Sequence, residues 1–237
     1  MGIYRDQFIK EMQLRGLSKM TQTSYLRGIT NLIRFYGKCP TQINVEEIKD
    51  YLLHFKNSKA QGRDHSRSAR TVNGHASAIK SFYKLVLKQN LSEDIPRIKP
   101  AITTPTILSK SEVKAMIDSV YNVQYKVMIM TLYATGMRSS ELLHLKIQDI
   151  DSKRMIINIR NGKGARDREA ALSPLLLCAL RTHWRLKSFK DTHFIFSPTR
   201  NRHGGELDKS LEKSSLTYAL NTAVKAAGIK KKSPLTF

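Results

Sequence analysis

Apolar residues in the first ninety positions recur every three or four residues, which is the spacing of amphipathic helices. One helix is expected to begin at Ser18, whose hydroxyl can cap it, and to end at Gly37. Another is expected after Asn44, because Glu47 completes a capping-box pattern. The predicted buried faces of these two helices are Tyr25, Ile29, Leu32, Ile33 and Tyr36, and Val45, Ile48, Leu52 and Phe55.

A longer helix is predicted from about Ser68 to Asn90, after a polar, aperiodic loop at residues 57–68. Its apolar positions share one face, and its polar positions share the opposite one. The apolar face is Val72, Ala76, Ile79, Tyr83 and Val86, and the polar face is Arg70, Asn73, Ser77, Lys84 and Lys88.

A change of pattern follows this helix. Residues 91–107 contain three prolines and no helical period, which is typical of a linker between domains. We therefore expect a helical domain at residues 1–92, a linker at 93–107 and a second domain at 108–237.

The second domain mixes helical and strand patterns. Ser109 and Glu112 form another capping-box pattern, and a more apolar helix is expected from Val123 to about Ala134. Two strands, at 154–160 and about 166–172, flank the hairpin signal Asn161-Gly-Lys-Gly164. The other expected elements are a short helix after Gly136, a turn at 148–151, a helix from Pro174 that carries Trp184, a short buried strand at 194–196, a loop at 199–206, and a helix at 214–227 closed by Gly228. The expected fold is mainly α-helical with a small antiparallel β-sheet.

Charge changes the interpretation of the polar faces. Lys and Arg number 41 and Asp and Glu 19, so the net charge is +22 and the isoelectric point is near 10.1. Both halves are basic, with 18 basic and 8 acidic residues in 1–100 and 23 and 11 in 101–237. This distribution favours a polyanion bound by the whole body of the protein. The face bearing Arg70, Asn73 and Lys84 could equally be solvated or lie against DNA.

Several classes of protein are disfavoured by the sequence. Cys39 and Cys178 lie far apart, which argues for a reducing compartment and against a disulfide framework or a cysteine metal site. The charged N-terminus does not resemble a signal peptide, and no apolar run approaches 18 residues. We expect a cytoplasmic protein with no membrane partner. The sequence also lacks serine-hydrolase, P-loop and His-pair metal motifs.

Arg138 is the strongest candidate for chemistry. It lies just after the Gly136 break, at the start of a short helix whose leucine side would fix its stem. A guanidinium held in this way is a preorganised fork for phosphate oxygens, although a solvated arginine at a helix start fits the same pattern. Lys163 lies at the glycine-flanked hairpin tip, where it could enter a DNA groove and donate a proton to a leaving oxygen, or simply be an exposed turn lysine. The turn carboxylates Asp149 and Asp151 fit a solvated turn better than a metal site.

These residues resemble the tyrosine recombinase (phage integrase) family, most closely its integron-integrase and Xer-like branch. Thr135-Gly-Met-Arg-Ser-Ser-Glu-Leu142 matches the first arginine box of the family, and Gly162-Lys-Gly-Ala-Arg-Asp-Arg168 matches its lysine hairpin. The region Thr21–Arg34 is similar to the helical core-binding, SAM-like domain, and Leu108–Val113 to the start of the catalytic domain. The resemblance implies a helical DNA-binding domain followed by a mixed α+β catalytic domain, incomplete at its C-terminus.

The resemblance also implies a reaction that uses no metal and no cofactor. A tyrosine attacks a DNA phosphodiester to give a 3′-phosphotyrosyl bond and a free 5′-hydroxyl, and a partner strand's 5′-hydroxyl reverses the step. Arg138 would bind the non-bridging oxygens, Lys163 would protonate the departing 5′-oxygen, and Glu141 would support Arg138. The double-stranded DNA partner would be contacted by Arg70, Asn73, Lys84, Arg166 and Arg168.

The chain departs from the family at its end. Ser233-Pro-Leu-Thr-Phe237 aligns with the start of the His-x-x-Arg box, with Leu235 at the usual histidine. The second arginine and the nucleophilic tyrosine have no counterpart, and Tyr218 is expected to be a packing residue among Leu216, Leu220 and Val224.

Three functional hypotheses remain. The sequence could belong to a longer recombinase that cuts and rejoins DNA, or to a truncated product that only binds DNA, so enzymatic activity of this chain is left open. An architectural nucleic-acid protein would explain the charge but not the two spaced motifs. Family members form tetramers on paired sites, often exchanging a C-terminal helix, and we expect a monomer off DNA.

Overall fold

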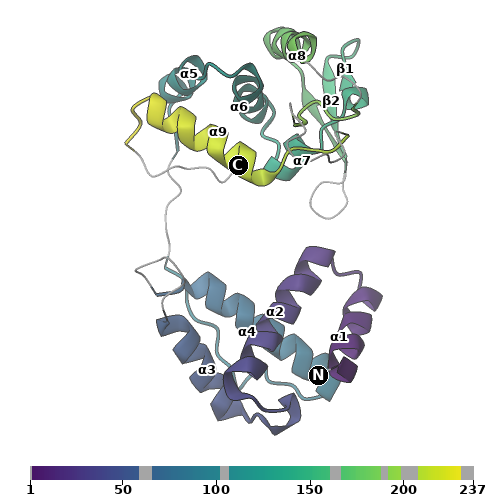
Figure 1. The fold of residues 1–237 in the computed structure, drawn as a ribbon, viewed down its shortest axis with the longest axis vertical. Helices are drawn as coiled ribbons and strands as arrows, with labels where there is room; N and C mark the ends of the chain where they lie inside the picture. The colour runs from purple at the N-terminus through teal and green to yellow at the C-terminus, as the bar shows by residue number, and fades with distance from the viewer. Residues whose placement is uncertain are drawn as a thin grey trace. The chain divides into compact units, whose positions relative to one another are not determined.

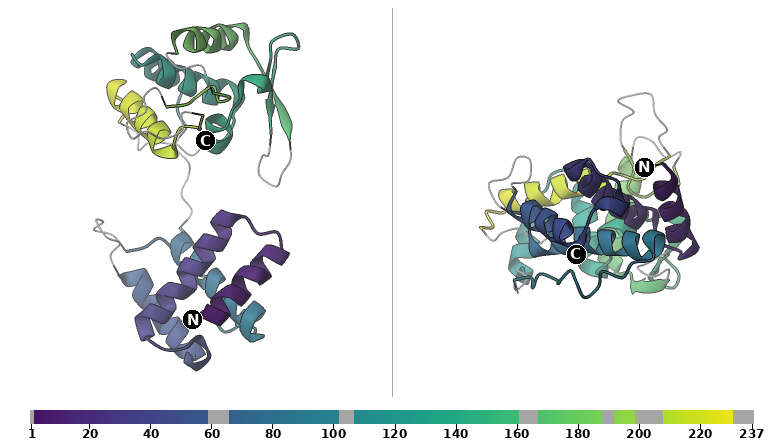
Figure 2. Two further views of the ribbon diagram at one scale, coloured as in Figure 1. Left: turned by 45° about the vertical axis from the view of Figure 1, so that its right-hand side comes forward. Right: turned by 90° about the horizontal axis from the view of Figure 1, so that it is seen from below.

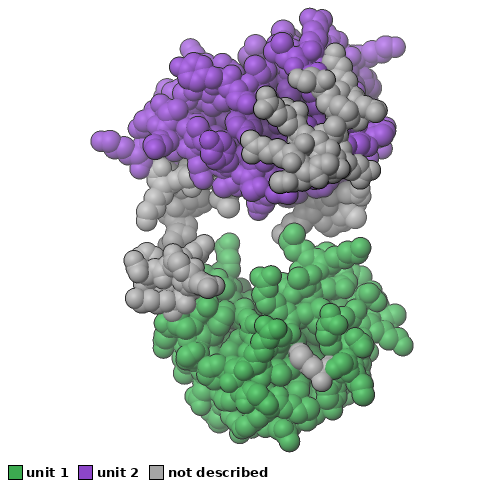
Figure 3. All heavy atoms as spheres, in the orientation of Figure 1, with its two compact units in different colours: residues 1–103 green, residues 104–237 purple. Residues whose placement is uncertain are grey.

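The structure is a computed structural model, and it describes residues 2–58, 66–101, 107–160, 167–187, 192–198 and 208–230. The chain divides into two compact units, Met1–Thr103 and Thr104–Phe237, which are coloured separately in Figure 3. Each unit has its own hydrophobic core. No helix in the described ranges is long and apolar enough to cross a membrane.

Unit 1 is helical, and its helices begin where the sequence supplies caps. The Ser18 hydroxyl accepts the Thr21 backbone N–H, and Asn44 and Glu47 form the predicted capping box. Gly37, with a φ of 64°, ends the second helix as expected. The elements are α1 (Gly2–Leu14), α2 (Lys19–Tyr36), η1 (Pro40–Gln42), α3 (Val45–Asn57), α4 (Ala69–Phe82) and η2 (Tyr83–Leu87), as shown in Figure 1.

The predicted long helix after Ser68 changes type before it ends. α4 is α-helical to Phe82, and Tyr83–Leu87 then form one π-helical turn that closes at Lys88, whose φ is 58°. The Tyr83 hydroxyl, buried in the core, donates to the carbonyl oxygens of Pro40 and Ile43. This contact joins the end of the helix to the α2–α3 connection, and its partners are too distant in sequence for periodicity to predict.

α2 and α4 cross at close range through small residues. A Cβ atom built on Gly28 would lie 2.7 Å from the Cβ of Ala78. This distance is shorter than real Cβ contacts, so glycine at position 28 permits the helices to approach. Ile29, Leu32, Ile79 and Phe82, all buried, pack on either side of the crossing.

The segment predicted as a linker begins by packing on unit 1. Leu91 and Ile95 are buried in its core. Asn73 of α4 also binds this segment: its side-chain amide donates to the Ile98 carbonyl (2.8 Å) and accepts the Ile98 N–H (2.9 Å). Residues 91–98 therefore pack with unit 1, and the division between the two units, at Thr103 and Thr104, lies within the predicted linker 93–107.

Unit 2 combines helices with a three-stranded antiparallel sheet of order β1-β2-β3. β2 and β3 are paired from Ile156 with Ala171 to Ile159 with Arg168. Both strands are shorter than predicted but lie at the predicted places. The elements are α5 (Lys110–Asp118), α6 (Val123–Thr135), α7 (Ser139–Leu143), η3 (Ile147–Asp149), β1 (Ile150–Asp151), β2 (Ile156–Ile159), β3 (Arg168–Ala171), α8 (Pro174–Leu186) and α9 (Lys213–Ala226).

α6 is the central helix of unit 2. Its buried residues on opposite sides, including Val127 and Ile129, belong to the same core as α8, α9 and the inner face of the sheet. Figure 2 shows the sheet at one edge of unit 2 beside these helices. α7 follows α6 after one glycine turn and packs against α6 and α9.

Two elements differ from the sequence prediction. Residues 148–151 contain the end of η3 and the edge strand β1 rather than a simple turn. Phe194 makes only an isolated antiparallel bridge with Lys146. Next to it Ile195 and Phe196 are buried, and the Lys187 ammonium donates to the carbonyls of Phe194 and Ile195. The backbone pairs with residues 145–147 through the Ile195 N–H to the Leu145 oxygen (3.0 Å) and the Ile147 N–H to the His193 oxygen (3.1 Å), so the predicted strand is reduced to this single bridge.

Candidate functional site

Arg138 is placed by the break between α6 and α7. Gly136, with a φ of 59°, ends α6, and the fully buried Met137 turns the chain toward α7. Arg138 is the residue that precedes α7, and Leu142 and Leu143 of that helix are buried. The backbone of Arg138 is therefore fixed by packing on both sides, while half of its side chain remains exposed. The predicted placement of Arg138 is confirmed.

Glu141 holds Arg138 at two points. One carboxylate oxygen, Oε2, accepts the backbone N–H of Arg138 at 2.8 Å. The other, Oε1, lies 2.7 Å from Nη1 of the Arg138 guanidinium. The same residue thus caps α7 and orients the guanidinium.

Arg168 of β3 completes a three-residue cluster. Its Nη2 donates to Glu141 Oε2 at 2.7 Å, so one carboxylate lies between two arginines. The Glu141 side chain is 4% exposed, against 50% for Arg138 and 38% for Arg168. The carboxylate is consequently withdrawn from solvent, while both guanidinium groups remain accessible to a ligand.

The protonation state of Glu141 follows from these contacts. Burial acts to raise its pKa, but the hydrogen bonds from the Arg138 backbone and side chain and from Arg168 outweigh burial, and the pKa lies below its ordinary value. Glu141 is thus an anion at neutral pH. Two guanidinium groups against one carboxylate leave this cluster with an excess positive charge that can bind anionic oxygens.

A second carboxylate, that of Asp149, lies in η3, which follows α7 along the chain. Asp149 is buried, and its Oδ1 lies 2.9 Å from Nε of Arg160, the residue that follows β2. Its Oδ2 accepts the backbone N–H of Lys146 at 3.0 Å. The interpretation of Asp149 as a solvated turn residue is wrong, because its ion pair joins η3 to the end of β2. Asp151, which accepts the N–H groups of Lys153 and Arg154, does form a turn.

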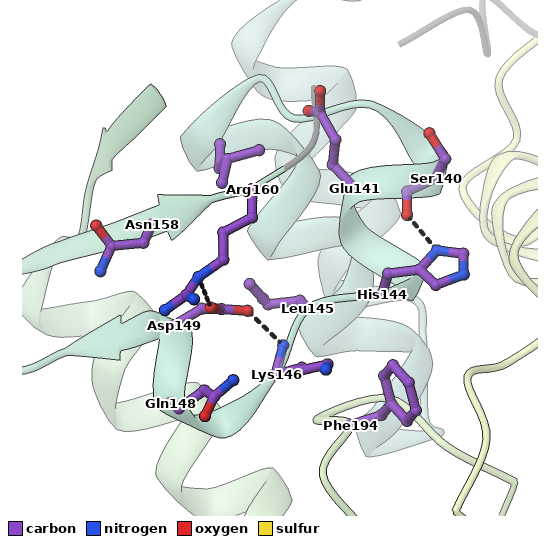
Figure 4. A pocket seen from close by; sticks show the side chains of 11 residues that line it. Ser140, Glu141, His144, Leu145, Lys146, Gln148, Asp149, Asn158, Arg160 and Phe194 are labelled. Carbon is purple, nitrogen blue, oxygen red and sulfur yellow. Dashed lines mark hydrogen bonds and ion pairs between the residues drawn. The ribbon is translucent and has the colours of Figure 1, made fainter. Parts of the chain in front are cut away.

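A hollow of about 550 Å³ opens between α7, η3 and the end of β2. Figure 4 shows the side chains around it, with Arg160 and Asp149 in contact and His144 turned toward Ser140. Nδ1 of His144 lies 2.8 Å from the Ser140 carbonyl oxygen, so the ring has a local partner. The lining also includes Glu141, Leu145, Lys146, Gln148, Asn158, Ile159 and Phe194.

The other residues selected from the sequence are distributed as follows. Lys163 and Arg166 lie outside the described residues. Arg70 and Lys84 are exposed on unit 1. Asn73 of unit 1 uses its amide to hold Ile98, so its predicted DNA contact would need the remaining donor or acceptor capacity.

Tyr218 does not pack as predicted. Leu216, Leu220 and Val224 of α9 are buried, but Tyr218 is 62% exposed. Its ring makes an edge contact with Tyr125, at 6.2 Å between centroids. Within the described residues, no group of three or more His, Cys, Asp or Glu side chains lies close enough together to hold a metal ion.

Two family descriptions match the chain. Residues 4–93 match the N-terminal SAM-like domain of phage integrases, and residues 106–237 match the phage integrase family. A putative integrase/recombinase of Sinorhizobium fredii is 33% identical over 84% of the chain, which spans 63% of that relative. Tyrosine recombinase XerA of Pyrococcus furiosus is 28% identical over 85% of the chain, which spans 67% of it. The chain therefore covers roughly two thirds or less of the length of these relatives.

Solved structures share the fold. A lambda integrase tetramer bound to a Holliday junction matches 98% of this chain with a TM-score of 0.72 and 15% identity, and the match covers 65% of that chain. XerH recombinase bound to its difH substrate matches 96% of this chain with a TM-score of 0.67 and 18% identity, and the match covers 70% of that chain.

Proposed function

This chain belongs to the phage integrase family of tyrosine recombinases, and on that premise we propose that it binds duplex DNA and holds a backbone phosphate at Arg138 for strand cleavage and rejoining. The observation that carries the proposal is the Arg138–Glu141–Arg168 cluster. A buried carboxylate fixes two accessible guanidinium groups, so donors are in place before the phosphate arrives.

Each residue has a proposed part in the reaction. Arg138 binds the non-bridging oxygens of the phosphate and stabilises the charge of the pentacoordinate transition state. Glu141 acts through Arg138 and Arg168 as a positioning residue. Lys163 donates a proton to the departing 5′-oxygen. The bond from phosphorus to the 5′-oxygen breaks as the bond to a tyrosine oxygen forms, and attack by a 5′-hydroxyl later restores a phosphodiester. We assign no nucleophile among the described residues.

The proposed partner is double-stranded DNA, bound by both basic units. Exposed Arg70 and Lys84 on unit 1 and Arg168 on unit 2 would contact the backbone, together with Asn73 and Arg166. A net charge of +22 supports binding through many phosphates. We propose that the protein acts in the cytoplasm, is a monomer off DNA, and assembles as a tetramer on paired DNA sites; the solved lambda integrase bound to a Holliday junction is a tetramer.

Binding to duplex DNA tests this proposal. Affinity, measured by fluorescence anisotropy at several salt concentrations, should fall by orders of magnitude between low and moderate salt if several phosphates are neutralised. Arg138→Gln should weaken binding and lower the slope of log affinity against log salt by about 1. The matched control is Arg154→Gln, which removes an exposed arginine paired with Glu169 outside the cluster. Absence of duplex binding at low salt, or affinity indifferent to salt, would refute the proposal.

A further inference from the structure

We propose that the hollow beside Arg138 is a second phosphate subsite, in which Lys146 and Arg160 bind a neighbouring phosphate of the same DNA strand. The inference deepens the proposed function and rests on it. Ser140 and Glu141 of α7 line the hollow, so it opens directly next to Arg138. A continuous DNA backbone presents successive phosphates, and one strand can therefore occupy both places.

Three of the lining side chains carry donors and have no polar partner among the described residues. Within the described part of the chain, no hydrogen bond or ion pair engages the side chains of Lys146, Gln148 or Asn158. The Lys146 ammonium lies 5.7 Å from the centre of the Phe194 ring, at the edge of the same hollow. A set of donors that converge on one space fits a ligand rich in acceptor oxygens.

Asp149 gives Arg160 a fixed direction. Its carboxylate is buried; Oδ2 accepts the Lys146 backbone N–H, and Oδ1 lies 2.9 Å from Arg160 Nε in an ion pair without hydrogen-bond geometry. Arg160 is itself 56% exposed. A guanidinium paired through Nε keeps its two terminal nitrogens for another partner, because Arg carries five donors in a planar fork.

The charge of the region favours an anion. Glu141 is bound by Arg138 and Arg168, and Asp149 is bound by Arg160. With Lys146, four cationic side chains lie in or beside the hollow against two carboxylates. Both carboxylates are engaged by cations, so they do not offer a site to a metal ion, and the remaining charge is positive.

The shape of the hollow fits a sugar-phosphate unit. Its volume is about 550 Å³, and Leu145 and Phe194 give it an apolar portion beside the cationic one. An inorganic phosphate would leave most of this space unfilled. We therefore assign the ligand as a phosphate of the DNA backbone rather than a free anion.

The test compares neutral variants in duplex binding. Lys146→Gln should lower affinity about five- to tenfold near 0.1 M salt and reduce the salt slope by about 1, as expected for one lost phosphate contact. The control, Lys153→Gln, removes an exposed lysine from the turn between β1 and β2 and should leave the slope unchanged. Asp149→Asn with Arg160→Gln removes both partners of the ion pair together, so no buried carboxylate is left unpaired; this double variant should weaken binding as Lys146→Gln does.

The outcomes separate this inference from the proposed function. Wild-type protein that does not bind duplex DNA would refute both. Wild-type binding with Lys146→Gln and the double variant indistinguishable from Lys153→Gln would refute the second subsite alone. Titration with inorganic phosphate distinguishes the two sources of the ligand. Variants that lose phosphate binding yet bind duplex DNA normally would show a free-anion site and overturn the assignment to DNA.

Discussion

At the scale of single residues, Glu141 has the most connected position in the site. It caps α7 by accepting the Arg138 backbone N–H, and its nearly buried carboxylate pairs with two guanidinium groups. Removing its charge should therefore affect both the local fold and the orientation of the arginines. A neutral amide can still accept one N–H, but it cannot pair with both cations.

We expect Glu141→Gln to lower the free energy of unfolding of unit 2 by about 1–3 kcal/mol. The value stays moderate because the two arginines left behind are partly solvated. Urea denaturation measures it, and Glu169→Gln is the control, because Glu169 forms an exposed pair with Arg154 and should cost under about 0.5 kcal/mol. Equal effects of the two substitutions would contradict the role given to Glu141.

The pH dependence of this difference has a definite sign. The pKa of Glu141 is lower in the folded protein than its ordinary value of 4.5. Its stabilisation is therefore fully present above that value and is lost as the pH falls through the lower, folded pKa. The gap in stability between wild type and Glu141→Gln should be constant near neutral pH and shrink in acid.

At the scale of elements, the crossing of α2 and α4 depends on Gly28. We expect Gly28→Ala to destabilise unit 1 by about 1–3 kcal/mol, because the new methyl group meets Ala78 within 2.7 Å. Gly74→Ala is the control on α4, where a Cβ has open space, and improved helix propensity should leave stability equal or up to about 1 kcal/mol higher. Thermal unfolding checks both. A Gly28→Ala protein as stable as Gly74→Ala would show that the helices can separate without cost.

Much of this element structure could be predicted from the sequence, because its signals are local. The caps at Ser18, Asn44 and Ser109 are confirmed, since each bond joins residues three positions apart. The contact of the Tyr83 hydroxyl, at the start of the π-helical turn, with the Pro40 carbonyl could not be predicted, because the two residues are 43 positions apart. Short-range periodicity carries no information on such contacts.

The candidate site also combines local contacts, which the sequence predicts, with contacts between distant residues, which it does not. Arg138 and Glu141 lie within one turn of each other, and their pairing follows from helix geometry. The Glu141–Arg168 and Asp149–Arg160 pairs join a helical segment to a hairpin, so they depend on how the sheet packs against α7. Asp149 has polar neighbours in Gln148 and Asp151, so the local sequence gives no signal that its carboxylate is buried.

At the scale of the whole molecule, the two units have separate cores, with no residue in common among those that the structure describes. We expect substitutions in one core to leave the other unit's unfolding unchanged. Leu32→Ala should cost about 2–5 kcal/mol in unit 1 alone, and Ile157→Ala a comparable amount in unit 2 alone, because both side chains are fully buried. Differential scanning calorimetry should show one transition moving in each variant. Two variants that shift the same transition would show that the units unfold as one.

The bond pair between Asn73 and Ile98 has a consequence for protein engineering. A chimaera that exchanges N-terminal units between recombinases needs a junction that leaves each folded body intact. Cutting at residue 93, where the linker was predicted to begin, would separate Ile95 and Ile98 from the helices that hold them. A junction placed after Ile98 keeps residues 91–98 with unit 1. We expect only hybrids with such a junction to be produced in full yield as soluble protein.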